Sequence, residues 1–260
     1  MEEYSKIIES LNIKFSKAKH IKIVQAATVV NHYDTENYLF MLHEGELLHT
    51  KNGNALEKGD ILFVPGGKMA RIGFGKQSIQ KHINNEEYIS NREKYFESVP
   101  DIAQVGKLED SFSYISFEAK VFDSINFFTS LDIPPFIISG QPSLSRLVKE
   151  LVVENIAELP GKPRAIKIKT EQLVIDMMRY VLREGMFVEQ LATNVTYFKD
   201  LRLIDIFNYI REYISTDLSN KILANVANVS EDYVGQYFKS MTGINPQDYI
   251  EYQQIGRAHV

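Results

Sequence analysis

Residues 219–250 read SNKILANVANVSEDYVGQYFKSMTGINPQDYI, and their capping residues divide the stretch into short helices. Ser219 and Ser230 are residues of a type that caps helix N-termini, and each precedes a segment with helical apolar spacing. The second segment stops at Gly243, a residue without Cβ that readily takes the left-handed conformation closing a helix. The stretch therefore predicts two helices joined by Asn228–Ser230, which is the arrangement of a helix-turn-helix.

Small and apolar side chains around this turn support the same interpretation. Ala224 would let the two helices cross closely, and Val229 would fill the angle between them. Downstream, Asn245 and Pro246 form a cap and first-turn pair that opens a further helix. Upstream, an apolar stripe at steps of four, three and four predicts a preceding helix with one buried face: Leu203, Phe207, Ile210 and Ile214.

The fixed spacing of this segment resembles the first helix-turn-helix of the AraC-type transcriptional regulators. The match spans 201–254, and it is carried by LAxxxxxS from Leu223 to Ser230, then by Tyr233, Phe238-Lys239, Gly243 and Tyr249-Ile250. The resemblance implies a sequence-specific regulator whose helix from Glu231 to Met241 lies in the major groove of promoter DNA. The other explanation is an accidental packing of well-capped helices.

Four positions of that helix would face DNA under this resemblance: Asp232, Gly235, Gln236 and Lys239. Gln236 would pair with adenine and Lys239 with a phosphate, while Gly235 would only allow close approach. Asp232 would be repelled by phosphate unless it accepts from a cytosine amino group. The alternative is that all four form the solvated face of a packed helix.

Three departures count against DNA binding. Between Leu201 and Gln254, four basic residues stand against seven acidic ones, a net charge of −3, whereas DNA-binding modules are usually basic. Asn220 stands where the family commonly has a buried leucine. The family has a second helix-turn-helix, but this chain ends in IGRAHV, so we expect an artificial truncation with 255–260 as a non-native tail.

The front half has the short, Val-, Ile- and Phe-rich segments of an antiparallel sheet or barrel between Ile21 and Gly75. Its segment GDILFVPGGKMARIGF is similar to the second motif of the cupins, whose enzymes hold a metal through histidines and a glutamate. Ala70 stands at the later histidine position, and His43 and His49 are six residues apart without a converging cluster. We expect a metal-free barrel without a cofactor.

The order of the predicted elements divides the chain into an α+β front part and an all-α, incomplete helix-turn-helix domain. An amphipathic helix is expected over 1–20, from the spacing of Ile7, Ile8, Leu11 and Phe15. A cupin-like domain follows over 21–186, with a surface excursion at 76–97, a strand in SYISFEAKVF and two helices at 144–159 and 170–184. Residues 187–200 are expected to be a linker.

This order also resembles the sensor domains of AraC-type regulators, which implies a small-molecule effector inside the barrel and a homodimer formed through the two helices. Tyr38, Phe40 and Leu42 share a face by strand alternation, and Arg71 and Ser116 are the candidate polar contacts near them. The alternative is that the three apolar residues are plain core and that Arg71 is a surface charge.

Composition excludes several classes of protein. The 260 residues carry 29 Lys and Arg against 34 Asp and Glu, a net charge of −5, and contain neither Cys nor Trp, so disulfides and thiolate chemistry are excluded. No secretory signal or bilayer-spanning run is visible, which favours a cytoplasmic protein. The chain has no phosphate-binding glycine loop and no GxSxG, so we expect a regulator and not an enzyme. The open alternatives are a ligand-binding or dimerisation module without DNA affinity, and a cupin-fold enzyme.

Overall fold

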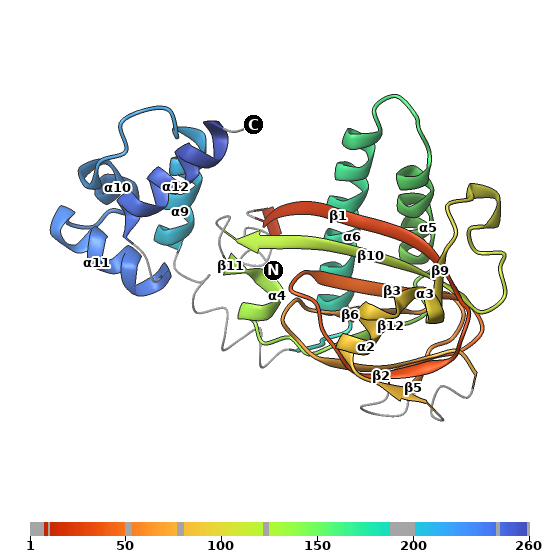
Figure 1. Cartoon of the computed structure of the whole chain (residues 1–260). Coiled ribbons are helices and arrows are strands. Elements are labelled where there is room, and N and C mark those ends of the chain that lie inside the picture. Colours follow the sequence, from red (N-terminus) through yellow and green to blue (C-terminus); the bar gives the residue numbers. More distant parts are fainter. Residues whose placement is uncertain are drawn as a thin grey trace. The chain divides into compact units, whose positions relative to one another are not determined.

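The computed structural model of the chain comprises two compact units, one from Leu11 to Val188 and the other from 1–10 together with 189–260 (Figure 1). The structure describes residues 8–9, 11–49, 54–76, 81–121, 125–187, 201–242 and 245–258. Nearly all of the expected linker, 188–200, and the helix-ending Gly243 lie outside the described residues. The fold class is α+β, with antiparallel sheets and helices.

The larger sheet is antiparallel throughout and has the order β12-β6-β3-β10-β1-β9, with β11 pairing to β10. Its long central strands β1 and β10 run side by side in Figure 1. Its strands are β1 (Leu11–Ile23), β3 (Asn37–Glu44), β6 (Ile61–Val64), β9 (Phe96–Ser98), β10 (Ser111–Val121), β11 (Ile125–Asn126) and β12 (Phe136–Ile138).

The smaller sheet has the order β5-β4-β7-β2-β8 and is antiparallel except for the short parallel pair of β2 and β8. The pairing gives two sheets and does not show a closed barrel. Its strands are β2 (Ala27–His32), β4 (Leu47–His49), β5 (Asn54–Ala55), β7 (Ala70–Phe74) and β8 (His82–Ile83).

The expected N-terminal helix over 1–20 is wrong for its second half, because Leu11–Ile23 is strand β1. Only residues 8 and 9 of the segment are helical, while 1–7 and 10 lie outside the described residues. Leu11, Ile13 and Phe15 alternate with polar residues, which is the spacing of a strand. Pairing with β10 from Leu11↔Val121 to Lys22↔Ser111 stabilises this alternation.

Strand β3 lies in the middle of the large sheet and is buried on both faces, as its apolar sequence predicts. One face lies in an aromatic core shared with the smaller sheet. Helices α5 (Pro142–Ile156) and α6 (Lys162–Arg183) pack on each other and against β1. Both predicted helices are thus present, but α6 begins eight residues before the expected Thr170, with Pro163 in its first turn.

The polar segment 76–97 is more than a surface excursion. It contains α2 (Asn85–Ser90) and α3 (Arg92–Tyr95), and both helices are anchored by buried tyrosines, Tyr88 and Tyr95. Periodicity did not reveal these helices because each is shorter than two turns. Two further short helices complete this unit: η2 (Ile102–Gln104) and α4 (Phe127–Ser130).

The other unit is entirely helical in its described part. The rings of Phe207, Phe238 and Tyr249 meet in its centre, with centroids 4.9, 5.0 and 5.8 Å apart. The predicted stripe Leu203, Phe207, Ile210 and Ile214 is buried. The helices are α9 (Leu201–Glu212), α10 (Asn220–Ala227), α11 (Glu231–Thr242) and α12 (Pro246–Ala258), and α12 continues past Gly256 into the expected tail.

Candidate functional site

The turn between α10 and α11 is tight because Asn228 adopts a left-handed conformation, with φ 52° and ψ 48°. Asparagine tolerates this conformation better than other residues with a Cβ. The amide of Asn228 donates to the carbonyls of Ala224 and Asn225, and the amide of Val229 donates to Ala224 at 3.0 Å. Ala224 is buried at this crossing, as its small side chain predicts.

Helix α11 has a buried face and an exposed face. Val234, Tyr237 and Phe238 are buried, whereas Asp232, Gln236 and Lys239 are exposed. The structure therefore brings three of the four predicted DNA-facing residues to one surface within their unit, at steps of four and three. The fourth, Gly235, is half-buried, and a Cβ placed there would lie 3.7 Å from Asn220 Nδ2 of α10.

Tyr233 is an exposed aromatic residue beside this face, and the site prediction did not include it. Its ring is 47% exposed and stacks on Tyr237, with centroids 5.7 Å apart and an interplanar angle of 26°. The guanidinium of Arg202 lies 5.0 Å from the Tyr237 ring centroid. In the sequence, Tyr233 and Tyr237 stand four residues apart and so lie on neighbouring turns of the helix, which is the pattern that indicates this ring pair.

The departure at Asn220 is accommodated by polar contacts. Gln247 of α12 donates from Nε2 to the Leu218 carbonyl at 2.9 Å and to Asn220 Oδ1 at 3.2 Å. Asn220 is half-buried. Where a leucine would make an apolar contact, its side-chain amide accepts a hydrogen bond that holds the start of α12 against the start of α10.

The predicted ligand-binding residues of the other unit come together on one face of the large sheet. Cross-strand register places Tyr38 opposite Ser116, Phe40 opposite Tyr114 and Leu42 opposite Phe112, all buried. The Phe40 ring centroid lies 5.4 Å from those of Phe74, Phe112 and Tyr114. These side chains therefore pack on one another and form a core.

The two predicted polar contacts behave differently. Ser116 is on this face, but its hydroxyl donates to Glu36 Oε2 at 2.8 Å, and Ser16 donates to the other carboxylate oxygen at 2.8 Å. Arg71 is not on this face, and its assignment there is wrong. It is exposed on β7 between the buried Ala70 and Ile72, with its Nη2 3.2 Å from His82 Nε2.

One end of the aromatic core contains buried polar groups. His32 Nδ1 and the Tyr38 hydroxyl are 2.8 Å apart. Burial lowers the pKa of His32 to about 4, so the ring is neutral at pH 7. Burial also raises the pKa of Tyr38 and of Tyr88, whose ring lies 5.1 Å from that of His32. The His32, Tyr38 and Tyr88 side chains are therefore neutral. The Asp34 carboxylate at this end accepts from the Tyr114 hydroxyl at 3.2 Å.

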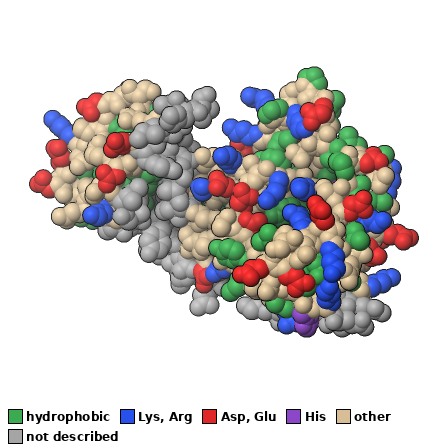
Figure 2. Space-filling view, viewed as in Figure 1, with side chains coloured by type: hydrophobic (Ala, Val, Ile, Leu, Met, Phe, Trp, Pro, Cys, Tyr) green, Lys and Arg blue, Asp and Glu red, His purple; other side chains and the backbone are tan. Residues whose placement is uncertain are grey.

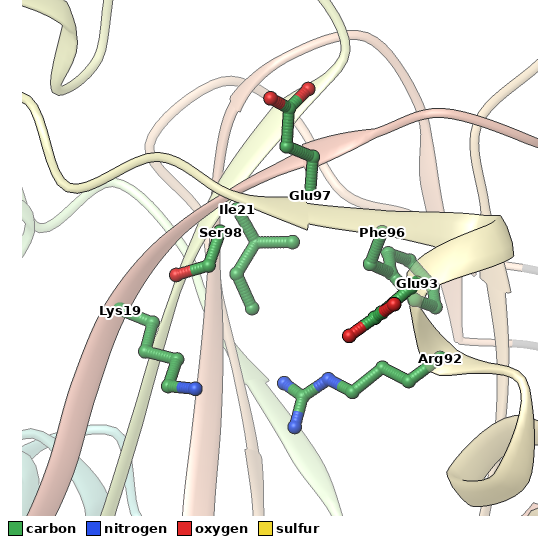
Figure 3. A pocket seen from close by; sticks show the side chains of 7 residues that line it. All are labelled: Lys19, Ile21, Arg92, Glu93, Phe96, Glu97 and Ser98. Carbon is green, nitrogen blue, oxygen red and sulfur yellow. The ribbon is translucent and has the colours of Figure 1, made fainter.

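A hollow of about 330 Å³ lies between β1 and the α3–β9 segment. Figure 3 shows the amino group of Lys19 and the guanidinium of Arg92 extending toward each other across it, while Glu97 points away. Ile21 and Phe96 provide apolar walls. Burial, followed by the positive charge of Arg92, lowers the pKa of Lys19.

The described part of the chain contains no group of three His, Asp or Glu side chains able to hold a metal ion. His43 and His49 are both buried, and His43 Nε2 lies 2.8 Å from Ser113 Oγ. None of the described helices is long and apolar enough to span a bilayer. On the face shown in Figure 2, basic and acidic side chains are mixed over the larger unit.

No family model matches the chain, and no curated protein matches its sequence. Among solved structures, it is similar to an apo form of ToxT from Vibrio cholerae strain SCE256, with 12% identity, a TM-score of 0.35, and coverage of 92% of this chain and 96% of that one. ToxT from Vibrio cholerae O395 gives 12% identity and a TM-score of 0.31, covering 93% and 97%. The AraC-like transcriptional activator CuxR gives 10% identity and a TM-score of 0.30, covering 100% and 90%. Because these TM-scores are all below 0.5, the likeness by itself establishes neither family nor function.

Proposed function

We propose that the chain is a ligand-responsive transcriptional regulator of AraC type, which binds promoter DNA through a helix-turn-helix formed by α10 and α11. The observation that carries the proposal is the exposed face of Asp232, Gln236 and Lys239 on α11, which follows the left-handed turn at Asn228. A recognition helix needs such a face, rigidly supported from behind, to enter a major groove.

The support behind α11 comes from its buried side chains. Val234 and Phe238 are fully buried, and the Phe238 ring packs on Phe207 of α9 and Tyr249 of α12. A helix held by two others keeps its outer side chains in fixed register, which sequence-specific contacts require. Gln236 would then read a base edge, Lys239 would contact a phosphate, and Tyr233 adds an apolar surface for a thymine methyl group or a sugar.

The test is selection of bound duplexes from a random library by the full chain, repeated with Gln236→Ala and Lys239→Ala. Gln236→Ala is expected to relax the preference at one base position, whereas Lys239→Ala weakens binding to all selected duplexes. Lys94→Ala, at an exposed position of α3 in the other unit, is the matched control and leaves binding unchanged. Equal loss on every duplex from Gln236→Ala would show that this residue does not read a base.

The larger unit would bind the effector and form a homodimer. On α6, Ile168 is 54% exposed, and Ile175 and Leu182 follow at steps of seven as half-buried residues, so one apolar stripe runs along the helix. A second copy packing on this stripe would bury it. Sedimentation of the full chain is expected to show a dimer that Ile168→Glu dissociates, and a parent protein that is monomeric at all concentrations would contradict this assignment.

The effector would act by binding more tightly to one arrangement of the two DNA-binding units than to another. Tyr38, Phe40, Leu42 and Ser116 stay candidate contacts in this proposal. Because they are packed on one another, an effector reaching them would have to displace core rings. Ligand-induced loss of hydrogen-exchange protection in β3 would support that route, and unchanged protection at saturation would exclude it.

A second candidate function is a ligand-binding or dimerisation module without DNA affinity. The net charge of −3 over 201–254 favours it, because this segment gives little electrostatic attraction to phosphates. A salt-dependent shift of selected DNA by the full chain separates the two candidates. A cupin-fold enzyme would instead copurify with stoichiometric iron, manganese or zinc.

A further inference from the structure

The hollow beside β1 brings two cationic side chains together. Lys19 and Arg92 converge on it from different elements, Lys19 from β1 and Arg92 from α3 (Figure 3). Both side chains are half-buried. Among the residues the structure describes, no ion pair joins either cation to a carboxylate, although several surface lysines have such partners. Glu93 and Glu97 also line the hollow, so its formal charges balance, and the positive charge is concentrated where Lys19 and Arg92 face each other.

The walls of the hollow are held in place before any ligand arrives. Strand β9 pairs with β1 at Ile21↔Ser98 and Ile23↔Phe96. The Tyr95 carbonyl accepts from the amide of Val24 at 2.8 Å. These contacts fix the segment that carries Arg92, so binding does not require ordering a loop.

Arg92 is also held by aromatic packing. Its guanidinium lies 5.9 Å from the centroid of the Tyr88 ring, which is buried and contacts His32. The Tyr88 ring in turn packs on His32, whose Nδ1 lies 2.8 Å from the Tyr38 hydroxyl. A ligand at Arg92 would therefore be linked to the predicted effector region through Tyr88, without displacing its packed rings.

The other lining groups define the kind of anion. Ile21 and Phe96 offer a small apolar wall. The Glu93 carboxylate can accept hydrogen bonds from ligand hydroxyl groups, and the Ser98 hydroxyl can donate or accept them. Glu97 also lines the hollow, but its carboxylate points away from the two cations (Figure 3). The volume of about 330 Å³ suits a small metabolite, near the lower end of known ligand sites.

We infer that this hollow binds a small organic dianion, either a phosphate monoester or a dicarboxylate, between Lys19 and Arg92. Two fixed positive charges match two negative charges, and the guanidinium offers paired donors to either group. The anion would also favour the charged form of Lys19, which burial and Arg92 now disfavour. The assignment of the hollow as the effector site rests on the proposed function. Binding of a dianion to the hollow, by contrast, does not depend on whether the chain binds DNA.

The experiment is isothermal titration calorimetry of the full chain with glycerol 3-phosphate, succinate and octanoate. At least one dianion is expected to bind. Tighter binding of glycerol 3-phosphate would identify a phosphate monoester as the ligand class, and tighter binding of succinate would identify a dicarboxylate. Lys19→Met and Arg92→Met each weaken that binding by about tenfold to hundredfold, the loss of one charge-assisted hydrogen bond. Lys19→Arg keeps the charge and is expected to weaken binding less than Lys19→Met does.

Lys22→Met is the matched control, since Lys22 is exposed on the same strand and does not line the hollow. Absence of binding by both dianions at millimolar concentration would overturn the inference, as would equal binding by the parent and both methionine variants. Tighter binding of octanoate than of either dianion would also overturn it. If dianions bind as expected but no DNA is selected, the site stands and the regulator proposal fails. If the chain selects DNA but neither dianion binds, the regulator proposal stands and the anion site fails.

Discussion

Acidification is expected to destabilise the larger unit through His43, a histidine buried in the middle of the large sheet. The side chain is 1% exposed, its Nε2 lies 2.8 Å from Ser113 Oγ, and its ring contacts that of His20 at 5.0 Å. Burial, together with the nearby His20, Lys149 and Lys58, lowers the pKa of His43 to about 3.

The sign of the effect follows from the two pKa values. Below the ordinary value of 6.5 the unfolded chain protonates His43, whereas the folded chain keeps it neutral down to about pH 3. Stability from this residue is therefore intact above pH 6.5 and is lost as the pH falls toward 3. Between pH 7 and pH 5 the free energy of unfolding decreases by about 2 kcal/mol through this one group.

The assay is urea-dependent hydrogen exchange of the full chain, measured by mass spectrometry on peptides from β3 and β10 at pH 7 and pH 5. His43→Gln cannot titrate but retains a partner for Ser113, so it should lose about 2 kcal/mol less than the parent over this range. The matched control is His82→Gln, because His82 is exposed on β8. An unchanged pH dependence in His43→Gln would refute the reasoning.

Three further predictions concern stability. Asn228→Ala places an ordinary residue in the left-handed turn and should destabilise the helical unit by about 1 kcal/mol, while Asn228→Gly should not; exchange of α10 and α11 peptides measures both. Phe40→Ala empties the centre of the aromatic core and should cost about 3–5 kcal/mol, seen as a lower urea midpoint for β3 peptides. Ser116→Ala removes the hydrogen bond to Glu36 and should cost about 1 kcal/mol by the same measurement, whereas Thr216→Ala in the other unit leaves these peptides unchanged.

Local signals explain what the sequence predicted well. The helices α10, α11 and α12 begin directly after Ser219, Ser230 and Asn245, as these residue types predicted, although the Ser219 side chain makes no capping hydrogen bond. The shared face of Tyr38 and Phe40 also follows from strand alternation alone. Each of these features depends on residues adjacent in the chain.

Non-local contacts explain what the sequence did not reveal. Strand β1 pairs with β10 about a hundred residues later, so the spacing of Leu11 and Phe15 did not separate helix from strand by itself. Lys19 lies in the segment that was expected to be helical. It lines the hollow only because β1 lies beside the α3–β9 segment. Arg92 stood in a run of charges typical of a solvated surface, and its position depends on the buried anchors Tyr88 and Tyr95.

If the exposed face of α11 lies against DNA, binding must depend on salt through Lys239. Fluorescence anisotropy of the full chain on its selected duplex, across a range of salt concentrations, gives the slope of log K against log salt. We expect a negative slope that Lys239→Ala reduces in magnitude by about one, corresponding to one lost phosphate contact. No salt-dependent binding, or a slope identical in the parent and Lys239→Ala, would contradict this expectation.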